Sequence, residues 1–129
     1  MSLIKFSKGD DIQLSEHFNS WEFECPCDRC TVQVIDMDLI EHLEKLRAHF
    51  NQPINIDSGY RCPHHNTDVG GALHSQHVRG KAADVKITNV SPSTVWKYVT
   101  DTKMFDGIGR YQTFNHLDVR GYLARWDNR

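Results

Sequence analysis

The decapeptide SQHVRGKAAD, residues 75–84, places a histidine seven positions before a carboxylate, with a glycine between them. Gly80 can adopt backbone angles that are closed to other residues, so the chain can fold His77 back over the segment that carries Asp84. A third candidate ligand, His116, follows in FNHLDVRG. Two imidazoles and one carboxylate form a three-ligand set that leaves the fourth position of a tetrahedral zinc ion for water. The sequence therefore predicts a catalytic zinc site at His77, Asp84 and His116.

Two predicted strands must position these ligands. In KAADVKI, residues 81–87, apolar residues alternate with a set that includes Asp84, and FNHLDVRG alternates in the same way. Successive side chains of a strand point to opposite faces of its sheet. If the apolar faces share one core, Asp84, His116 and Asp118 project from the other face of the same sheet. Ala82 lies on that face and leaves room for a ligand above the strand.

Periodic apolar residues predict two helices. The first spans about 38–50, and Asp38 with Glu41 resembles a capping box at its start. The second spans about 91–102, with Pro92 at the first helical position after a serine N-cap. Together with the strands, these helices predict an α+β fold with the zinc site on the polar face of the sheet.

The length of 129 residues is typical of one domain, and no linker or repeat interrupts it. We therefore expect a single domain over residues 1–129, with residues 1–30 as a cysteine-containing segment packed on it. Within that segment, Leu14, Phe18, Trp21 and Phe23 are expected to be apolar anchors of a short helical turn.

The four cysteines form a Cys-x-Cys-x2-Cys cluster, Cys25, Cys27 and Cys30, and one distant residue, Cys62. Four thiolates can close a tetrahedral structural zinc site that fixes the N-terminal segment to the turn before Cys62. Two disulfides are an alternative with three connectivities, although a bridge between Cys25 and Cys27 would be strained. Free thiols are the third alternative, and each of the three gives the cysteines a structural role.

Three stretches of this chain resemble the zinc D,D-carboxypeptidases and L-alanyl-D-glutamate peptidases that cut peptidoglycan stem peptides, a family with a Hedgehog-type zinc fold. They are SGYRCPHHN, VGGALHSQHVRGKAADV and FNHLDVRG, and the resemblance extends over most of residues 14–126. It implies a small antiparallel sheet with helices packed on one side. It also implies zinc as cofactor, and His77, Asp84 and His116 as its ligands.

The resemblance implies roles for further residues. Arg61 is expected to stabilise the oxyanion or to hold a substrate carboxylate, and Ser75 to hydrogen-bond the substrate or to cap a turn. Several relatives have an acidic residue three positions before the last zinc histidine, where this chain has Thr113, which cannot accept a proton at neutral pH. Asp118 is then the predicted general base, or else it orients that histidine. His74 is the alternative base.

These observations favour a zinc metallopeptidase that hydrolyses bonds in peptidoglycan stem peptides or cross-bridges, as a D,D-carboxypeptidase or an endopeptidase. The alternative is a zinc-fold binding module that recognises cell-wall peptides without catalysis, which Thr113 favours. A net charge of -2 and the lack of a basic stripe argue against nucleic acid. The sequence has no long apolar span and no secretion signal, so we expect a monomer that does not insert into membranes and is made in the cytoplasm. Such a protein would reach the cell wall by release or delivery, as a phage lysin or a tail-associated enzyme does.

Overall fold

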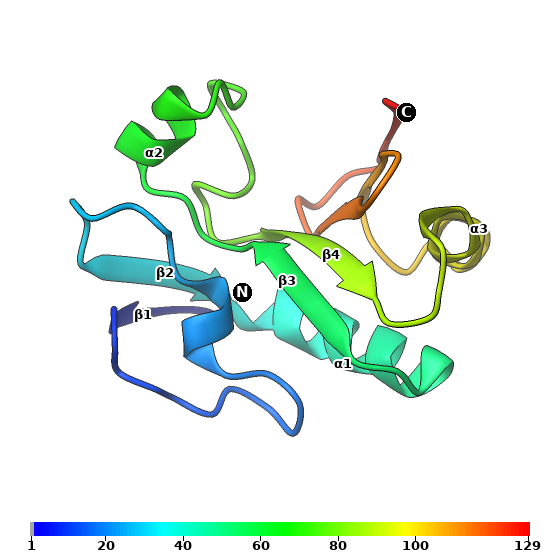
Figure 1. Ribbon diagram of the computed structural model, residues 1–129, viewed down its shortest axis with the longest axis horizontal. Coiled ribbons are helices and arrows are strands. Elements are labelled where there is room, and N and C mark those ends of the chain that lie inside the picture. Colours follow the sequence, from blue (N-terminus) through cyan, green and yellow to red (C-terminus); the bar gives the residue numbers. More distant parts are fainter. Residues whose placement is uncertain (1) are drawn as a thin grey trace.

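The computed structural model of the chain describes residues 2–129, and it has the α+β architecture that the sequence predicts (Figure 1). In chain order the elements are β1 (Leu3–Ser7), the 3-10 helix η1 (Ser20–Phe23), β2 (Val32–Asp36), α1 (Met37–Phe50), β3 (Ile54–Ser58), α2 (Pro63–Asp68), β4 (Ala82–Ile87), α3 (Pro92–Thr102), β5 (Gly107–Arg110), β6 (Asn115–Asp118) and β7 (Ala124–Asp127).

The main sheet has five strands in the order β3-β4-β6-β5-β7. Its first four strands are antiparallel neighbours, which confirms the predicted small antiparallel sheet, and β7 adds a parallel strand at the edge next to β5. Strands β1 and β2 form a separate antiparallel pair. The strands that carry the predicted ligands, β4 and β6, are therefore direct neighbours in the interior of the main sheet.

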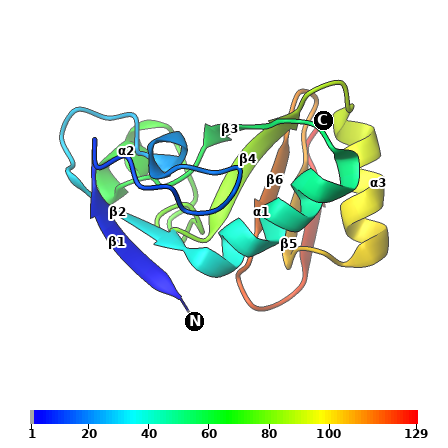
Figure 2. The same ribbon diagram turned by 90° about the horizontal axis from the view of Figure 1, so that it is seen from below.

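Helices α1 and α3 cover the apolar face of the main sheet, as Figure 2 shows from below. Their buried residues join those of β3 to β6 in one cluster, which contains Leu43 and Leu46 from α1 and Val99 from α3. Burial of such side chains is the main stabilising contribution to a domain of this size. Helix α2 lies away from both, on the other side of β3 and β4 in Figure 1.

The helix boundaries agree with the sequence except at the start of α1. The predicted capping box of Asp38 and Glu41 is wrong, because Asp36 is the N-cap and its side chain accepts a hydrogen bond from the backbone N of Asp38. The cap is thus supplied by the last residue of β2, which enters the helix without a loop. At α3 the predicted start is confirmed, with Ser91 as N-cap and Pro92 in the first turn.

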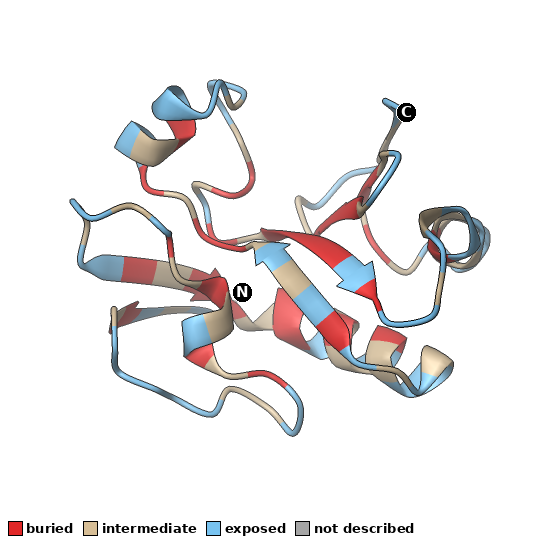
Figure 3. Ribbon diagram, in the orientation of Figure 1, coloured by how far each residue is buried: buried red, intermediate tan, exposed pale blue. Residues whose placement is uncertain are grey.

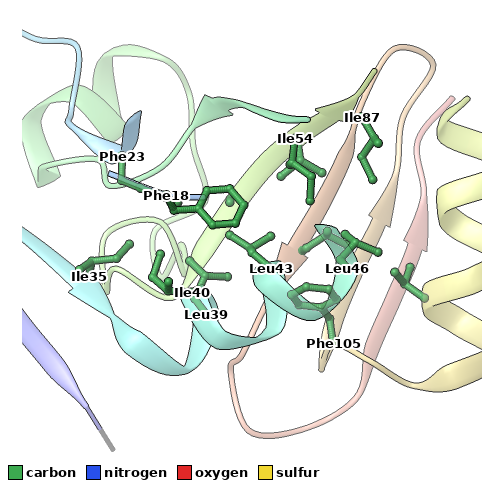
Figure 4. Packing of buried hydrophobic residues seen from close by; sticks show 14 of the residues in the cluster. Phe18, Phe23, Ile35, Leu39, Ile40, Leu43, Leu46, Ile54, Ile87 and Phe105 are labelled. Atoms are coloured by element: carbon green, nitrogen blue, oxygen red, sulfur yellow. The ribbon is translucent and has the colours of Figure 1, made fainter. Parts of the chain in front are cut away.

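The N-terminal segment contributes to the same core. Phe6, Phe18 and Phe23 are buried in the main cluster, and Figure 4 shows Phe18 and Phe23 beside residues of α1. The expectation that Trp21 is an apolar anchor is wrong, because this residue is 63% exposed. The turn at η1 is a 3-10 helix, which has about three residues per turn. Trp21 therefore does not share the inward direction of Phe18 and Phe23.

The alternation in β4 and β6 produces the two sheet faces that the sequence predicts. Asp84 pairs with His116 across the two strands, and Ala82 pairs with Asp118. Both strands are nevertheless buried over almost their whole length, as the colouring of β4 in Figure 3 shows. Most of the polar face is thus covered by other parts of the chain. Within residues 2–129, no helix has the length and apolarity needed to cross a bilayer.

Candidate metal centre

The side chains of His77, Asp84 and His116 converge on one point above the polar face of the main sheet. One ligand atom from each lies within 4.8 Å of the others, and all three residues are buried. Nε2 of His77 lies 3.3 Å from Oδ1 of Asp84, and Nδ1 of His116 lies 3.2 Å from the same oxygen. The structure therefore brings together the three residues that the sequence predicts as metal ligands.

These separations fit a zinc ion. Zinc binds imidazole nitrogen and carboxylate oxygen at about 2.0–2.1 Å in a tetrahedron, whose edges are then about 3.3 Å long. The two measured ligand-to-ligand distances have that length. A group of two histidines and one carboxylate is also the donor set of catalytic zinc sites with one open position.

The orientation of His77 is fixed by the turn that precedes β4. Its Nδ1 donates to the carbonyl oxygen of Gly59 at 2.8 Å, which leaves Nε2 without a proton. This Nε2 atom is buried and has no hydrogen-bond partner among the described residues. The turn itself depends on Gly80, whose φ is +71° and where a Cβ would lie 2.5 Å from the carbonyl oxygen of Val34. An unprotonated, buried nitrogen that faces a carboxylate oxygen is a site for a cation.

His116 is fixed in the same way but through the opposite ring nitrogen. Its Nε2 lies 2.6 Å from Oδ2 of Asp118, so that Nδ1 faces Asp84. Asp118 is fully buried, and the guanidinium of Arg120 donates to both of its oxygens at 2.7–3.1 Å. A carboxylate on the distal ring nitrogen is a common partner of metal-binding histidines, because it sets the tautomer and increases the basicity of the ligand.

The charges of the site favour a positive group at its centre. Burial alone would raise the pKa of Asp84, but hydrogen bonds and charges from His116 and His77 outweigh it and lower that pKa well below its ordinary value. Burial opposes a charge on His116, but its hydrogen bonds to Asp118 and Asp84 raise its pKa. Hydrogen bonds from His116 and Arg120 likewise overcome burial and lower the pKa of Asp118 to about 2. Two ionised carboxylates therefore flank His116, and a divalent cation would satisfy the same field.

Arg61 and Ser75 lie next to the ligands. Nη2 of Arg61 donates to Oδ2 of Asp84 at 3.4 Å, on the oxygen that does not face the histidines. Asn66 and Ser58 accept from the other guanidinium nitrogens. Oγ of Ser75 accepts a hydrogen bond from the backbone N of His77 at 3.2 Å, so the turn-capping role expected of Ser75 is present.

A pocket of ≈ 370 Å³ opens over the three ligands. The predicted site residues Arg61, His74 and Ser75 line it, together with aromatic and cationic side chains that sequence reasoning did not assign to the site; these are Tyr111, Phe114, Arg120 and Trp126. Asp118 does not line the pocket, because it lies behind the ring of His116. Thr113, which stands where several relatives have an acidic residue, is exposed and does not line the pocket.

Two glycines of β5 make the room for this arrangement. A Cβ at Gly107 would lie 2.1 Å from Oδ2 of Asp118, and a Cβ at Gly109 would lie 2.5 Å from the indole of Trp126. Such distances are far below van der Waals contact. The Gly-x-Gly pattern is visible in the sequence. Which side chains the two glycines make room for depends on the register in which β5 pairs with β6 and β7.

A comparison with known protein families matches the part of the chain that carries the three candidate ligands. The family model described as Peptidase M15 matches residues 16–119, which contain all three ligands. This chain belongs to the Peptidase M15 family. No curated protein sequence matches it. Peptidase M15 proteins are a zinc D-Ala-D-Ala carboxypeptidase-like family, so membership implies a metallopeptidase, zinc as its cofactor and a peptide as its substrate.

Membership in the Peptidase M15 family agrees with the independent argument from donor atoms and tautomers. The His77 nitrogen that faces Asp84 is one that the protein leaves unprotonated, His116 presents Nδ1 to the same oxygen, and the ligand spacing is that of tetrahedral zinc. The residues present therefore fit the metal that the family uses.

Proposed function

We propose that the chain is a zinc-dependent peptidase that hydrolyses peptide bonds in the stem peptides or cross-bridges of peptidoglycan, with His77, Asp84 and His116 as zinc ligands. The observation that carries the proposal is the convergence of these three side chains in the wall of a pocket large enough for a peptide segment. Membership in the Peptidase M15 family supports the chemistry, and the cell-wall substrate is the finer part of the proposal.

Zinc bound by these residues would supply a Lewis acid for the scissile carbonyl and a water nucleophile that is available at neutral pH. The protein contributes by holding the ligands in place before the substrate binds. Gly59 and Asp118 hold the two imidazole rings, and Arg61 holds Asp84. Such positioning avoids the reorganisation that would otherwise add to the barrier of the reaction.

We propose that Asp118 is a positioning residue for His116, and that His74 takes the role of general base. Both oxygens of Asp118 are engaged by His116 and Arg120, and the residue is fully buried, so no oxygen is free for a proton of the substrate or water. His74 is exposed and lines the pocket, where an imidazole can accept a proton near neutral pH.

The charges of the pocket support a substrate with carboxylate groups. Arg61 and Arg120 both line the pocket, each next to a buried aspartate. A guanidinium recognises a carboxylate through paired hydrogen bonds. A chain-terminal carboxylate is present in the substrate of a carboxypeptidase, and acidic side chains are present within stem peptides. We propose that Ser75, at the same wall, contacts the peptide backbone.

The test is digestion of purified sacculi by the zinc-loaded protein, followed by mass analysis of the soluble products. We expect released D-alanine if the enzyme trims chain ends, or shortened and uncrosslinked muropeptides if it cuts within them. A chelator should abolish release, and added zinc should restore it. His116→Ala should be inactive, whereas His64→Ala, which changes an exposed histidine of α2 outside the pocket, should keep full activity.

The alternative function, a binding module without catalysis, predicts a different result in the same experiment. The zinc-loaded protein would then sediment with sacculi but release no fragment at any enzyme concentration. That outcome would contradict the proposed peptidase and would support the alternative.

A further inference from the structure

The four cysteines lie together at a second place, outside the pocket. Cys25, Cys27 and Cys30 come from the loop between η1 and β2, and Cys62 is the N-cap of α2. Figures 1 and 2 both show this loop beside α2. The Sγ atoms of all four residues lie within 4.8 Å of one another.

The spacing of the sulfur atoms matches a tetrahedral metal site. Sγ of Cys27 lies 3.5 Å from that of Cys25, 3.3 Å from that of Cys30 and 3.6 Å from that of Cys62. Zinc binds thiolate at about 2.3 Å, which gives a tetrahedral edge of about 3.8 Å between sulfurs. Two disulfides would instead divide the sulfurs into pairs about 2.05 Å apart. Cys27 is nearly equidistant from three sulfurs, and all four cysteines are free thiols in the structure.

Each sulfur also accepts a hydrogen bond from a nitrogen donor. The backbone N of Cys62 donates to Cys25, and that of His65 donates to Cys62, both at 3.4 Å. The side-chain amide of Gln33 donates to Cys30 at 3.4 Å. Nζ of Lys8 lies 3.8 Å from Sγ of Cys27 and adds a positive charge. Donors of this kind stabilise the negative charge of thiolates and orient metal ligands.

We propose that Cys25, Cys27, Cys30 and Cys62 bind one structural zinc ion. Four protein ligands leave no open position, so this site is closed and does not catalyse a reaction. On binding, the thiols that are still protonated release their protons to solvent, and the thiolates become the ligands.

This second site connects to the catalytic centre through the turn 59–62. Cys62 directly follows Arg61, and the backbone N of Arg61 donates to the carbonyl oxygen of His77 at 3.2 Å. At the other end of the turn, Gly59 accepts from the ring of His77. A Cβ at Gly59 would lie 2.6 Å from the backbone of Phe23, so the turn packs tightly on the N-terminal segment. The structural zinc therefore positions Arg61 and His77 through this turn.

The test measures metal content in two chains, wild type and His116→Ala. We expect two tightly bound zinc ions in the wild type and one in His116→Ala, because the substitution leaves the cysteines unchanged. A mercurial reagent that blocks thiols should release that one ion from His116→Ala and one of the two from the wild type. Since the readout is metal content and not activity, the site can be present even if the peptidase proposal fails.

The absorption spectrum of the cobalt-loaded protein identifies which atoms bind the metal. His116→Ala loaded with cobalt in place of zinc should show the sulfur-to-metal charge-transfer absorption and the strong visible bands of a tetrahedral thiolate site. Cys30→Ser should weaken these bands and lower metal retention at least about tenfold, as expected for the loss of a ligand or its support. Thr31→Ser, a change at the neighbouring exposed residue, should leave both unchanged.

Three results would overturn the proposal. The first is a His116→Ala chain that holds no zinc while all four thiols react at once with a thiol reagent. The second is a mass of the unreduced protein that shows disulfides. The third is bound iron in place of zinc, which the same four-sulfur geometry would accept.

Discussion

The orientations of two histidine rings determine which of their nitrogen atoms the candidate centre offers to a metal ion. His77 donates from Nδ1 to a backbone carbonyl, whereas Nε2 of His116 contacts Asp118, so the other ring nitrogen of each histidine faces Asp84. The two rings are thus held by different partners from different elements. This arrangement places three electron-pair donors around one point before any ion is bound.

We expect Asp118→Asn to retain zinc and to lower kcat about 10- to 100-fold, the usual cost of losing an outer partner of a ligand. An amide keeps the shape but removes the negative charge that raises the basicity of His116. Zinc per chain and steady-state kinetics on a muropeptide measure the two effects. Asp127→Asn is the matched control, because Asp127 pairs with Arg129 as Asp118 pairs with Arg120, but at the exposed end of the chain. Unchanged kcat in Asp118→Asn would contradict the positioning role.

The convergence of the three candidate ligands could be predicted from the sequence because each residue lies in a pattern with a local cause. Asp84 and His116 lie on strands whose alternation fixes their face, and His77 lies before a glycine that allows the chain to turn back. The general base could not be predicted in this way. The proposal for this role depends on which oxygens are free, and the hydrogen bonds from Arg120 that engage both oxygens of Asp118 are visible only in the structure.

At the scale of elements, the antiparallel part of the sheet could be predicted, but the pairing of its last strand, β7, could not. Nothing in the sequence pattern of β5 and β7 indicates that these two strands pair in parallel. This pairing nevertheless brings the ring of Trp126 to 4.9 Å from the ring of His116, measured between centroids. The start of α1 differs from the prediction because a strand residue provides the cap. Local sequence rules describe isolated elements, whereas these details depend on their neighbours.

Strand β5 offers a test of how the sheet supports the centre. We expect Gly107→Ala to lower kcat and the melting temperature, because the added methyl group would lie 2.1 Å from Oδ2 of Asp118 and must displace it. The loss of activity should be similar to that of Asp118→Asn. In an Asp118→Ala background the same substitution should have little further effect, because the carboxylate that it meets is gone. The comparison is a double-mutant cycle, and strict additivity of the two losses would contradict direct packing between these residues.

At the scale of the whole molecule, we propose that residues 2–129 act as one domain. Phe6 near the start and Leu117 near the end belong to the same buried cluster, and β1 pairs with β2 directly before α1. The turn 59–62 lies between the cysteine cluster and the pocket and contacts the N-terminal segment at Phe23. Loss of order in the N-terminal segment should therefore reach the catalytic ligands. Residue patterns alone suggested that the cysteine cluster fixes the N-terminal segment to this turn, but not that the turn contacts His77.

Anomalous X-ray diffraction at the zinc absorption edge, from crystals of the protein purified with zinc, tests the central claim most directly. We expect an anomalous peak about 2 Å from Nε2 of His77, Oδ1 of Asp84 and Nδ1 of His116, with a solvent or substrate atom as its fourth neighbour. The peak should be absent in crystals of His116→Ala. Zinc-loaded crystals in which these three side chains surround no anomalous peak would contradict the account.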